Sequence, residues 1–278
     1  MRLALRSLRA GAAAVALGTT ATVGGCAPAM TTQQEVQAGA DYARQINAQL
    51  PILRDQYTNQ YINQLGRQIA AQADQRGIPY TFYVVNSDVV NAFAIPGGHI
   101  YINRGIIERA DNVAQVAGVL AHEVAHVAER HGIQQAQRAQ NANTMLGVLY
   151  GVLLRRNPGG VEQAAVQVGG TAVFAGYSRE AERDADRAAV AYLMRSGYSP
   201  NGLPQFFAKM QAEQQRNPSK VEQWFATHPG TNERIQVTQS MIAQTPGATS
   251  TRLVTDTREF QNFRARVRSL TPAPQDRR

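Results

Sequence analysis

The sequence predicts a mostly helical α+β fold with a small antiparallel sheet, and three observations support this prediction. Long segments before and after residues 80–103 place apolar residues three or four positions apart, which is the spacing of amphipathic helices. The block 80–103 instead contains short runs rich in aromatic and β-branched residues, which favour strands. The chain has 278 residues, 44% of them hydrophobic, so it can bury one sizeable core.

The expected elements follow from these spacings. Strands are expected at 80–85, 91–95 and 99–103. Helices are expected at 33–50, 55–76, 112–131, 133–155, 161–174, 179–195, 201–215, 231–242 and 256–270. Asn112 and Gln115 have the spacing of a capping box at the start of the helix over 112–131, and Gly132 indicates its end.

The N-terminal segment has the pattern of a signal peptide over 1–25. Arg2, Arg6 and Arg9 precede an apolar stretch that contains no acid. Glycine and threonine dilute this stretch, so a membrane-spanning helix of about 20 apolar residues is a poor fit. We therefore expect export and cleavage.

Cys26 follows this segment in the run Val23-Gly24-Gly25-Cys26, which resembles a bacterial lipobox. It is the only cysteine, so it cannot form an intramolecular disulfide, and lipidation would explain it. We expect a periplasmic protein tethered to the outer membrane through Cys26, with Ala27 matching the outer-membrane sorting pattern. The alternative is a chance cysteine beside an ordinary cleavage site.

The formal net charge is +8, and arginines crowd the C-terminal end of the chain. Such a run can favour anionic headgroups or acidic substrates, but a solvated helix face is the interpretation favoured for it. We expect no nucleic-acid partner.

His122-Glu123-Val124-Ala125-His126 is the strongest signal in the sequence. Residues four apart on a helix project from one face, so the two imidazoles can share one zinc ion, and Glu123 beside them can act as general base. Two histidines that bind no metal are the alternative. His131 lies five residues beyond His126 and therefore off the shared face.

A catalytic zinc needs a third protein ligand and an open fourth position. The helix expected over 179–195 offers Glu182 and Asp186, four residues apart on one face. Glu182 would bind the metal, and Asp186 would accept the N–H of a ligand histidine. An ordinary acidic helix face is the alternative for this segment taken alone.

Together with the run 177–186 and with Asn91 to Gly98, the segment His122 to His126 resembles metallopeptidase family forty-eight, of the gluzincin HExxH type. This family holds BepA-like periplasmic proteases and HtpX-like and CaaX-type membrane proteases. The resemblance implies a zincin-like catalytic domain with Glu182 as third ligand. It adds His228 and Arg234 as candidate catalytic residues that face the substrate or the oxyanion; His228 can alternatively cap the metal in a resting state.

The run 91–95 is a candidate edge strand, and its residues Asn91, Ala92, Phe93 and Ala94 would bind an extended peptide through the main chain. We therefore expect a zinc endopeptidase, with one zinc per chain, that cleaves unfolded or misassembled envelope proteins. The alternatives are an envelope assembly factor with structural zinc and a zinc hydrolase of small amides. The expected organisation is a signal peptide over 1–25, a linker and helix over 26–50, the catalytic domain over 51–250, and a C-terminal helix and basic tail over 251–278.

Overall fold

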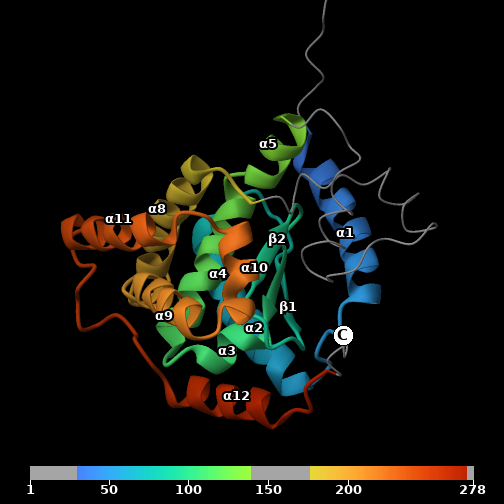
Figure 1. The fold of residues 1–278 in the computed structure, drawn as a ribbon. Coiled ribbons are helices and arrows are strands. Elements are labelled where there is room, and N and C mark those ends of the chain that lie inside the picture. Colours follow the sequence, from blue (N-terminus) through green and yellow to red (C-terminus); the bar gives the residue numbers. More distant parts are fainter. Residues whose placement is uncertain (1–29, 139–175, 274–278) are drawn as a thin grey trace, which may run out of the picture. The chain divides into compact units, whose positions relative to one another are not determined.

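A three-stranded sheet and the helices on its two faces organise the chain (Figure 1). The computed structural model describes residues 30–138 and 176–273. Cys26, the helix expected over 161–174 and most of the one expected over 133–155 lie outside the described residues.

The described helices confirm the mostly helical α+β class. They are α1 (Thr32–Gln49), α2 (Gln56–Ala73), α3 (Arg104–Arg109), α4 (Val113–Ala128), α5 (His131–Arg138), α8 (Arg179–Arg195), α9 (Gly202–Arg216), α10 (Pro218–Thr227), α11 (Thr231–Gln244) and α12 (Arg258–Ser269). The short helices α3 and α10 were not predicted. Among the described residues, none of the helices has the length and apolarity needed to cross a membrane.

The sheet is mixed, whereas the sequence predicted an antiparallel one. Its strands are β1 (Thr81–Val85), β2 (Ala92–Ile95) and β3 (His99–Asn103), in the order β1-β3-β2. β2 and β3 form an antiparallel hairpin in which Ile95 faces His99, and its turn contains Gly97 and Gly98 at φ 83° and 88°. β3 also pairs with β1 in parallel, with Thr81 opposite His99. β2 is therefore at an edge, as predicted.

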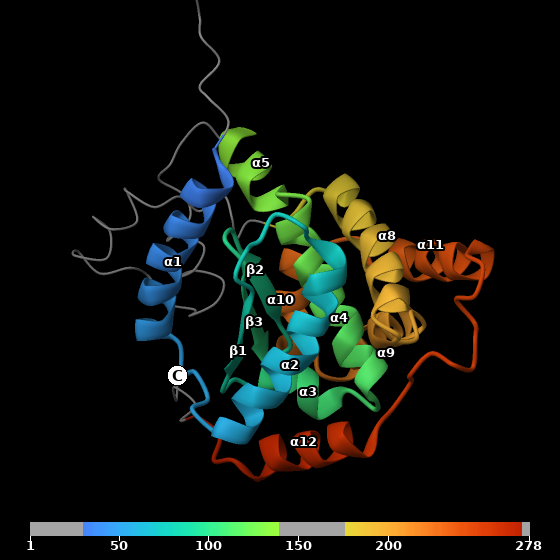
Figure 2. The same ribbon diagram turned by 180° about the vertical axis from the view of Figure 1, so that it is seen from behind.

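Different helices cover the two faces of the sheet (Figure 2). The helices α2 and α4 share one apolar core with strand residues such as Phe82, Ala94 and Ile100. On the opposite face, α1 packs Ile46 against the side chains that strands β2 and β3 direct to that side, including Tyr101. The catalytic segments predicted from sequence lie on the α4 side.

The helix α4 is buried along its whole length, from Val113 to Val127. The side chain of Asn112 caps it by accepting a hydrogen bond from the backbone N–H of Gln115, at 3.1 Å. The prediction that Gly132 ends this helix was wrong, because the chain leaves it at Arg130, whose φ is 58°. Packing of α8 and α9 against α4 covers the face that carries the two histidines.

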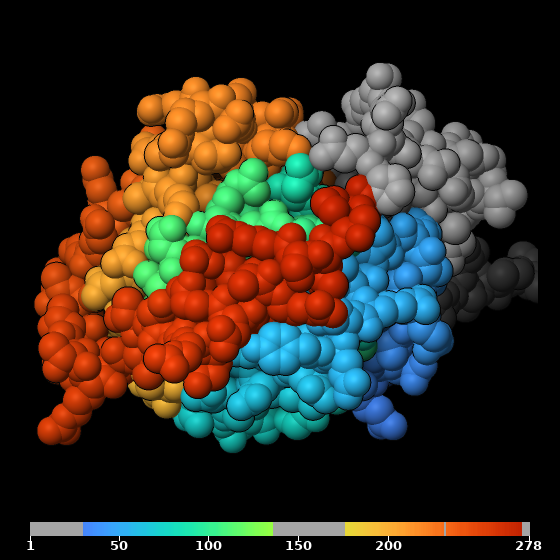
Figure 3. Space-filling view, turned by 90° about the horizontal axis from the view of Figure 1, so that it is seen from below, coloured from blue at the N-terminus to red at the C-terminus, as the bar shows by residue number. Residues whose placement is uncertain are grey.

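The helix α12 closes one end of the molecule. Figure 3 shows it in red across the underside, beside α2 in light blue and α3 in green. The buried guanidinium of Arg104 in α3 donates to the backbone oxygens of Val267 and Leu270, at 2.9 and 3.1 Å, which ties α3 to the end of α12.

Candidate metal centre

Four buried side chains from separate parts of the sequence converge at one point. His122 and His126 come from α4, Glu182 comes from α8, and His228 follows α10 directly. One ligand atom from each lies within 4.8 Å of the others. The structure thus brings together the predicted ligand triad and adds His228 as a fourth donor.

The distances between these donor atoms suit a zinc ion. The Nε2 atoms of His122 and His126 are 3.0 Å apart, and the Glu182 carboxylate lies 3.4 Å from each of them. Ligand atoms placed tetrahedrally about 2.0–2.1 Å from zinc are about 3.4 Å apart. Glu182 Oε1 has no hydrogen-bond partner among the described residues, so it is free to bind a cation. The residues therefore fit the metal.

Charged groups surround His122. Asp186 Oδ1 lies 3.0 Å from His122 Nδ1, the orienting position expected for this aspartate. The guanidinium of Arg234 donates to both oxygens of Asp186, at 2.7 Å each, and forms an ion pair with Glu182. Arg234 is only 2% exposed and also lies over the ring of Phe207. The described partners of the Arg234 guanidinium are therefore the two carboxylates beside His122.

An imidazole and a phenol contact His126. His131 Nδ1 lies 3.0 Å from His126 Nδ1, and the ring of Tyr177 stacks on His126 at a centroid distance of 3.8 Å. Sequence reasoning placed His131 off the ligand face, which holds for a continuous helix. The left-handed turn at Arg130 interrupts the helix and brings His131 back. Arginine at that position gave no signal of such a turn.

Glu123 is fully buried, and neither of its carboxylate oxygens has a hydrogen-bond partner among the described residues. Its nearest recorded charge partner is His228, with Nε2 3.5 Å from Glu123 Oε1. Burial raises the pKa of this carboxyl above its usual value. A buried carboxylate with open acceptor sites is suited to take a proton from a water beside it.

Charge within the cluster sets its protonation. Burial raises the pKa of Glu182, but Arg234, His228 and His122 outweigh it and hold the pKa well below the usual value. Burial lowers the pKa of His126 well below its ordinary value. Glu182 and His126 are therefore unprotonated, and each can offer a lone pair to a metal. Burial and Arg234 also lower the pKa of His122, but Glu182 and Asp186 raise it to about 9, so a metal held by His122 would have to displace a proton.

His228 connects the cluster to the edge strand. Its Nδ1 lies 3.3 Å from Glu182 Oε2, and its Nε2 lies 3.3 Å from the backbone oxygen of Ala92 in β2. The Trp224 ring lies beside it, with the centroids 4.5 Å apart. Sequence reasoning named His228 but gave no sign of its contact with the strand.

The main chain of β2 explains that contact. Asn103 N donates to Asn91 O at 2.9 Å, so Asn91 belongs to a hydrogen-bonded pair of the β2–β3 hairpin. Such pairs alternate along antiparallel strands, so Ala92 and Ala94 direct their N–H and C=O groups away from β3. The preceding Val90 N–H donates to Lys220 O of α10, at 2.7 Å. In this structure α10 and His228 therefore occupy hydrogen-bonding groups along and just before the free edge of β2.

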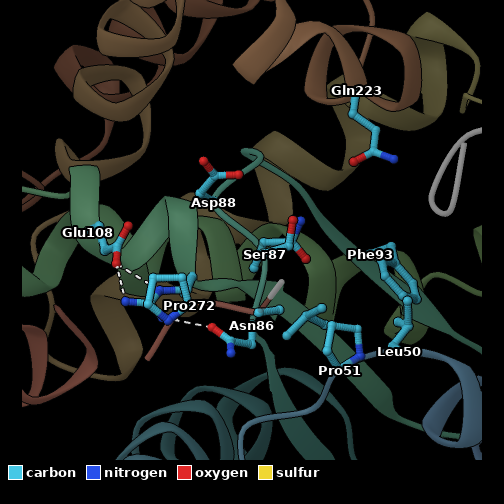
Figure 4. Close-up of a pocket in the computed structure, with 13 residues that line it drawn as sticks. Leu50, Pro51, Asn86, Ser87, Asp88, Phe93, Glu108, Gln223 and Pro272 are labelled. Atoms are coloured by element: carbon cyan, nitrogen blue, oxygen red, sulfur yellow. Dashed lines mark hydrogen bonds and ion pairs between the residues drawn. The ribbon is translucent and has the colours of Figure 1, made fainter. Parts of the chain in front are cut away.

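A cavity of about 300 Å³ lies apart from the metal cluster, at the end of the sheet (Figure 4). The labelled Phe93 of β2 and Gln223 of α10 both line it. Among the predicted peptide-binding residues only Phe93 lines it, and none of the four metal donors does. It is therefore not part of the metal centre.

Comparison with known proteins agrees with the geometry. The family model described as "Peptidase family M48" matches residues 56–242. The beta-barrel assembly-enhancing protease of Yersinia pestis is 34% identical over 211 residues, covering 74% of this chain and 43% of that protein. The putative beta-barrel assembly-enhancing protease of Vibrio cholerae is 31% identical over 228 residues, covering 78% and 46%. The mitochondrial metalloendopeptidase OMA1 of Schizosaccharomyces pombe is 22% identical over 187 residues, covering 67% and 54%. The chain spans less than half the length of the two bacterial relatives.

Proposed function

This chain belongs to peptidase family M48, a family of metalloendopeptidases, and on that premise we propose that it is a zinc-dependent endopeptidase. The proposal assigns one zinc ion per chain to His122, His126 and Glu182. It is carried by a single observation, the convergence of these side chains from two helices with donor atoms 3.0–3.4 Å apart.

The proposed chemistry divides between the metal and Glu123. A zinc ion held by His122, His126 and Glu182 would polarise a carbonyl and would lower the pKa of a water towards about 7. Glu123 takes the proton of the attacking water as general base and passes it to the leaving amine. The burial of Glu123, and the lack of a hydrogen-bond partner for its oxygens among the described residues, support this role. Asp186 and Arg234 hold His122 and Glu182 in position.

His228 has a separate proposed role. A catalytic zinc site keeps one position open, whereas His228 offers a fourth protein donor here. We assign the described arrangement to a resting form. In this form His228 would occupy the fourth coordination position of the zinc and covers the backbone oxygen of Ala92. His228→Ala should then keep its zinc and cleave an unfolded substrate faster than the wild type. Slower cleavage by zinc-loaded His228→Ala would instead assign His228 to the oxyanion.

The proposed substrate is an extended polypeptide that pairs with β2 along Asn91 to Ala94. Main-chain pairing at a strand edge makes few demands on side chains, which favours unfolded or misassembled proteins. The names of the bacterial relatives concern β-barrel assembly, which supports envelope proteins as substrates and a periplasmic site of action. A lipid anchor on Cys26 belongs to the same proposal, and mass spectrometry of the mature N-terminus tests it, since an unmodified Cys26 would remove it.

The test is metal analysis combined with cleavage of casein by the wild type and Glu123→Gln. Glu123→Gln should retain one zinc per chain and lose activity by about 10²–10⁴-fold, the usual contribution of a general base. Glu180→Gln is the control, because this exposed acid of α8 lies outside the cluster. An assembly factor with structural zinc would instead keep its cellular function in Glu123→Gln. Cleavage of small amides but not of casein would favour a small-amide hydrolase.

A further inference from the structure

We propose that His131 is a positioning residue for the ligand His126, and that the turn at Arg130, fixed by Glu35 of α1, holds His131 in place. The proposal rests on the proposed function in one respect, since it takes His126 as a metal ligand. It adds a helix outside the matched segment 56–242 to the machinery of the metal centre.

The first step concerns the two nitrogens of His126. Its Nε2 faces the cluster, 3.0 Å from His122 Nε2 and 3.4 Å from Glu182 Oε1. A neutral imidazole that binds metal through Nε2 carries its proton on Nδ1, and that N–H needs an acceptor. His131 Nδ1, at 3.0 Å and buried, is positioned to accept it. The contact parallels the one from His122 Nδ1 to Asp186.

The second step concerns the backbone that delivers His131. The helix α4 ends at Ala128, and α5 begins at His131, with Arg130 at φ 58° between them. Glycine is the usual residue in the left-handed position after a helix, and a non-glycine residue there is uncommon. Among the described residues Arg130 is the only non-glycine residue with positive φ. The turn is therefore stabilised by something other than glycine.

The third step identifies that stabilising group. Arg130 Nε lies 3.1 Å from Oε2 of Glu35, a fully buried carboxylate in the first turn of α1. The same oxygen accepts from Arg76 Nη1 at 3.1 Å, and Arg76 Nη2 donates to Val127 O at 2.8 Å. Glu35 thus ties both the turn and the last residues of α4 to α1.

The position of α1 is itself fixed by close backbone packing. A Cβ added at Gly39 would lie 2.0 Å from the backbone oxygen of Pro96, and one at Gly97 would lie 2.9 Å from Glu35 O. Neither position has room for a side chain, so α1 rests directly on the turn that follows β2. The position of the Glu35 carboxylate is therefore set by the same turn that ends the edge strand.

The experiment measures how fast zinc leaves the full chain when a chromophoric chelator is added in excess. His131→Phe keeps the ring volume but removes the acceptor, and should release zinc about 10–100-fold faster than the wild type. His131→Asn places an amide oxygen near the position of Nδ1 and should recover most of the loss. Glu35→Gln should accelerate release to a smaller extent, and Asp41→Asn, an exposed acid on the same helix, should not.

Cobalt substitution supplies a second readout that a purely structural role would not alter. The visible bands of the cobalt-loaded protein should shift in His131→Phe and return in His131→Asn. Zinc release and cobalt spectra equal to those of the wild type in folded His131→Phe would overturn the inference. If that variant does not fold, Glu35→Gln decides in the same way, because it leaves the imidazole in place. A wild type that binds no zinc would overturn the proposed function instead, and the inference with it.

Discussion

The two proposed ligand histidines, His122 and His126, sit four residues apart on one helix, yet they have very different surroundings. His122 is held by a charged and buried set of groups, with the side chains of Asp186 and Arg234 only 2% and 3% exposed. His126 contacts a neutral imidazole and an aromatic ring, and the turn behind them depends on Arg130, whose side chain is 31% exposed. The first, charged flank, which is Asp186 and Arg234 beside His122, is therefore built into the folded core. The second, neutral flank, which is His131 and Tyr177 beside His126, depends on the turn at Arg130.

The largest expected effect lies on the charged flank. Arg234→Met leaves the buried Asp186 carboxylate without its cation and should lower the free energy of unfolding by about 3–5 kcal/mol. Urea denaturation of the purified chain measures this. The control is Arg183→Met, which breaks the exposed pair with Glu233 between the same two helices and should cost about 1 kcal/mol or less. Equal losses in the two variants would mean that the charged flank is not a stabilising core.

The second-largest effect is expected on metal removal, which should affect the two flanks differently. Zinc in 100-fold excess over its dissociation constant should stabilise the chain by about 2.7 kcal/mol, measured by thermal denaturation with and without chelator. Without the metal, the ion pair between Asp186 and Arg234 persists. The His126 ring is then no longer held by zinc, so His131 and the turn after α4 lose a fixed contact. Amide hydrogen exchange should therefore rise more in residues 128–133 than in residues 183–188. A uniform rise across both segments would contradict the distinction.

A smaller effect is expected at Tyr177. Its ring stacks on His126 with an interplanar angle of 11°, and such aromatic contacts contribute about 0.5–1.5 kcal/mol beyond burial. Tyr177→Leu should weaken zinc binding by about 2–12-fold in a chelator competition, which is that energy expressed as a binding constant. Tyr177→Phe keeps the ring and serves as the control. A loss in Tyr177→Phe as large as in Tyr177→Leu would assign the effect to the hydroxyl.

The smallest expected change in stability concerns Arg130→Gly. Glycine relieves the strain of the left-handed backbone but removes one of the two arginines that pair with the buried Glu35 carboxylate, which keeps Arg76. The free energy of unfolding should therefore change by less than about 1 kcal/mol. Urea denaturation checks this value. Zinc release should nevertheless become faster, because the turn loses its tie to Glu35. A stable variant with unchanged zinc release would show that Arg130 does not restrain the second flank.

The pairs of candidate ligand residues could be predicted from sequence because helical periodicity fixes which side chains share a face. His122 with His126, and Glu182 with Asp186, are such pairs, and the structure brings both into one cluster. The contact of His131 could not be predicted, because it depends on a left-handed residue that is arginine rather than glycine.

The same reasoning explains the fold. Apolar spacing predicted the long helices. The ten-residue helix α10 has too few turns for apolar residues to recur clearly at three or four positions. The direction of the sheet's pairing depends on which strand enters its middle, and that is β3, the last of the three in sequence. Local composition gives the strands but not their order.

The position of the metal is the most direct test of the central claim. Crystals of the zinc-loaded chain, measured at the zinc absorption edge, should give one anomalous peak about 2.0–2.2 Å from the Nε2 atoms of His122 and His126 and from a Glu182 oxygen. A peak bound elsewhere, or one held by the histidines with Glu182 turned away, would contradict the account.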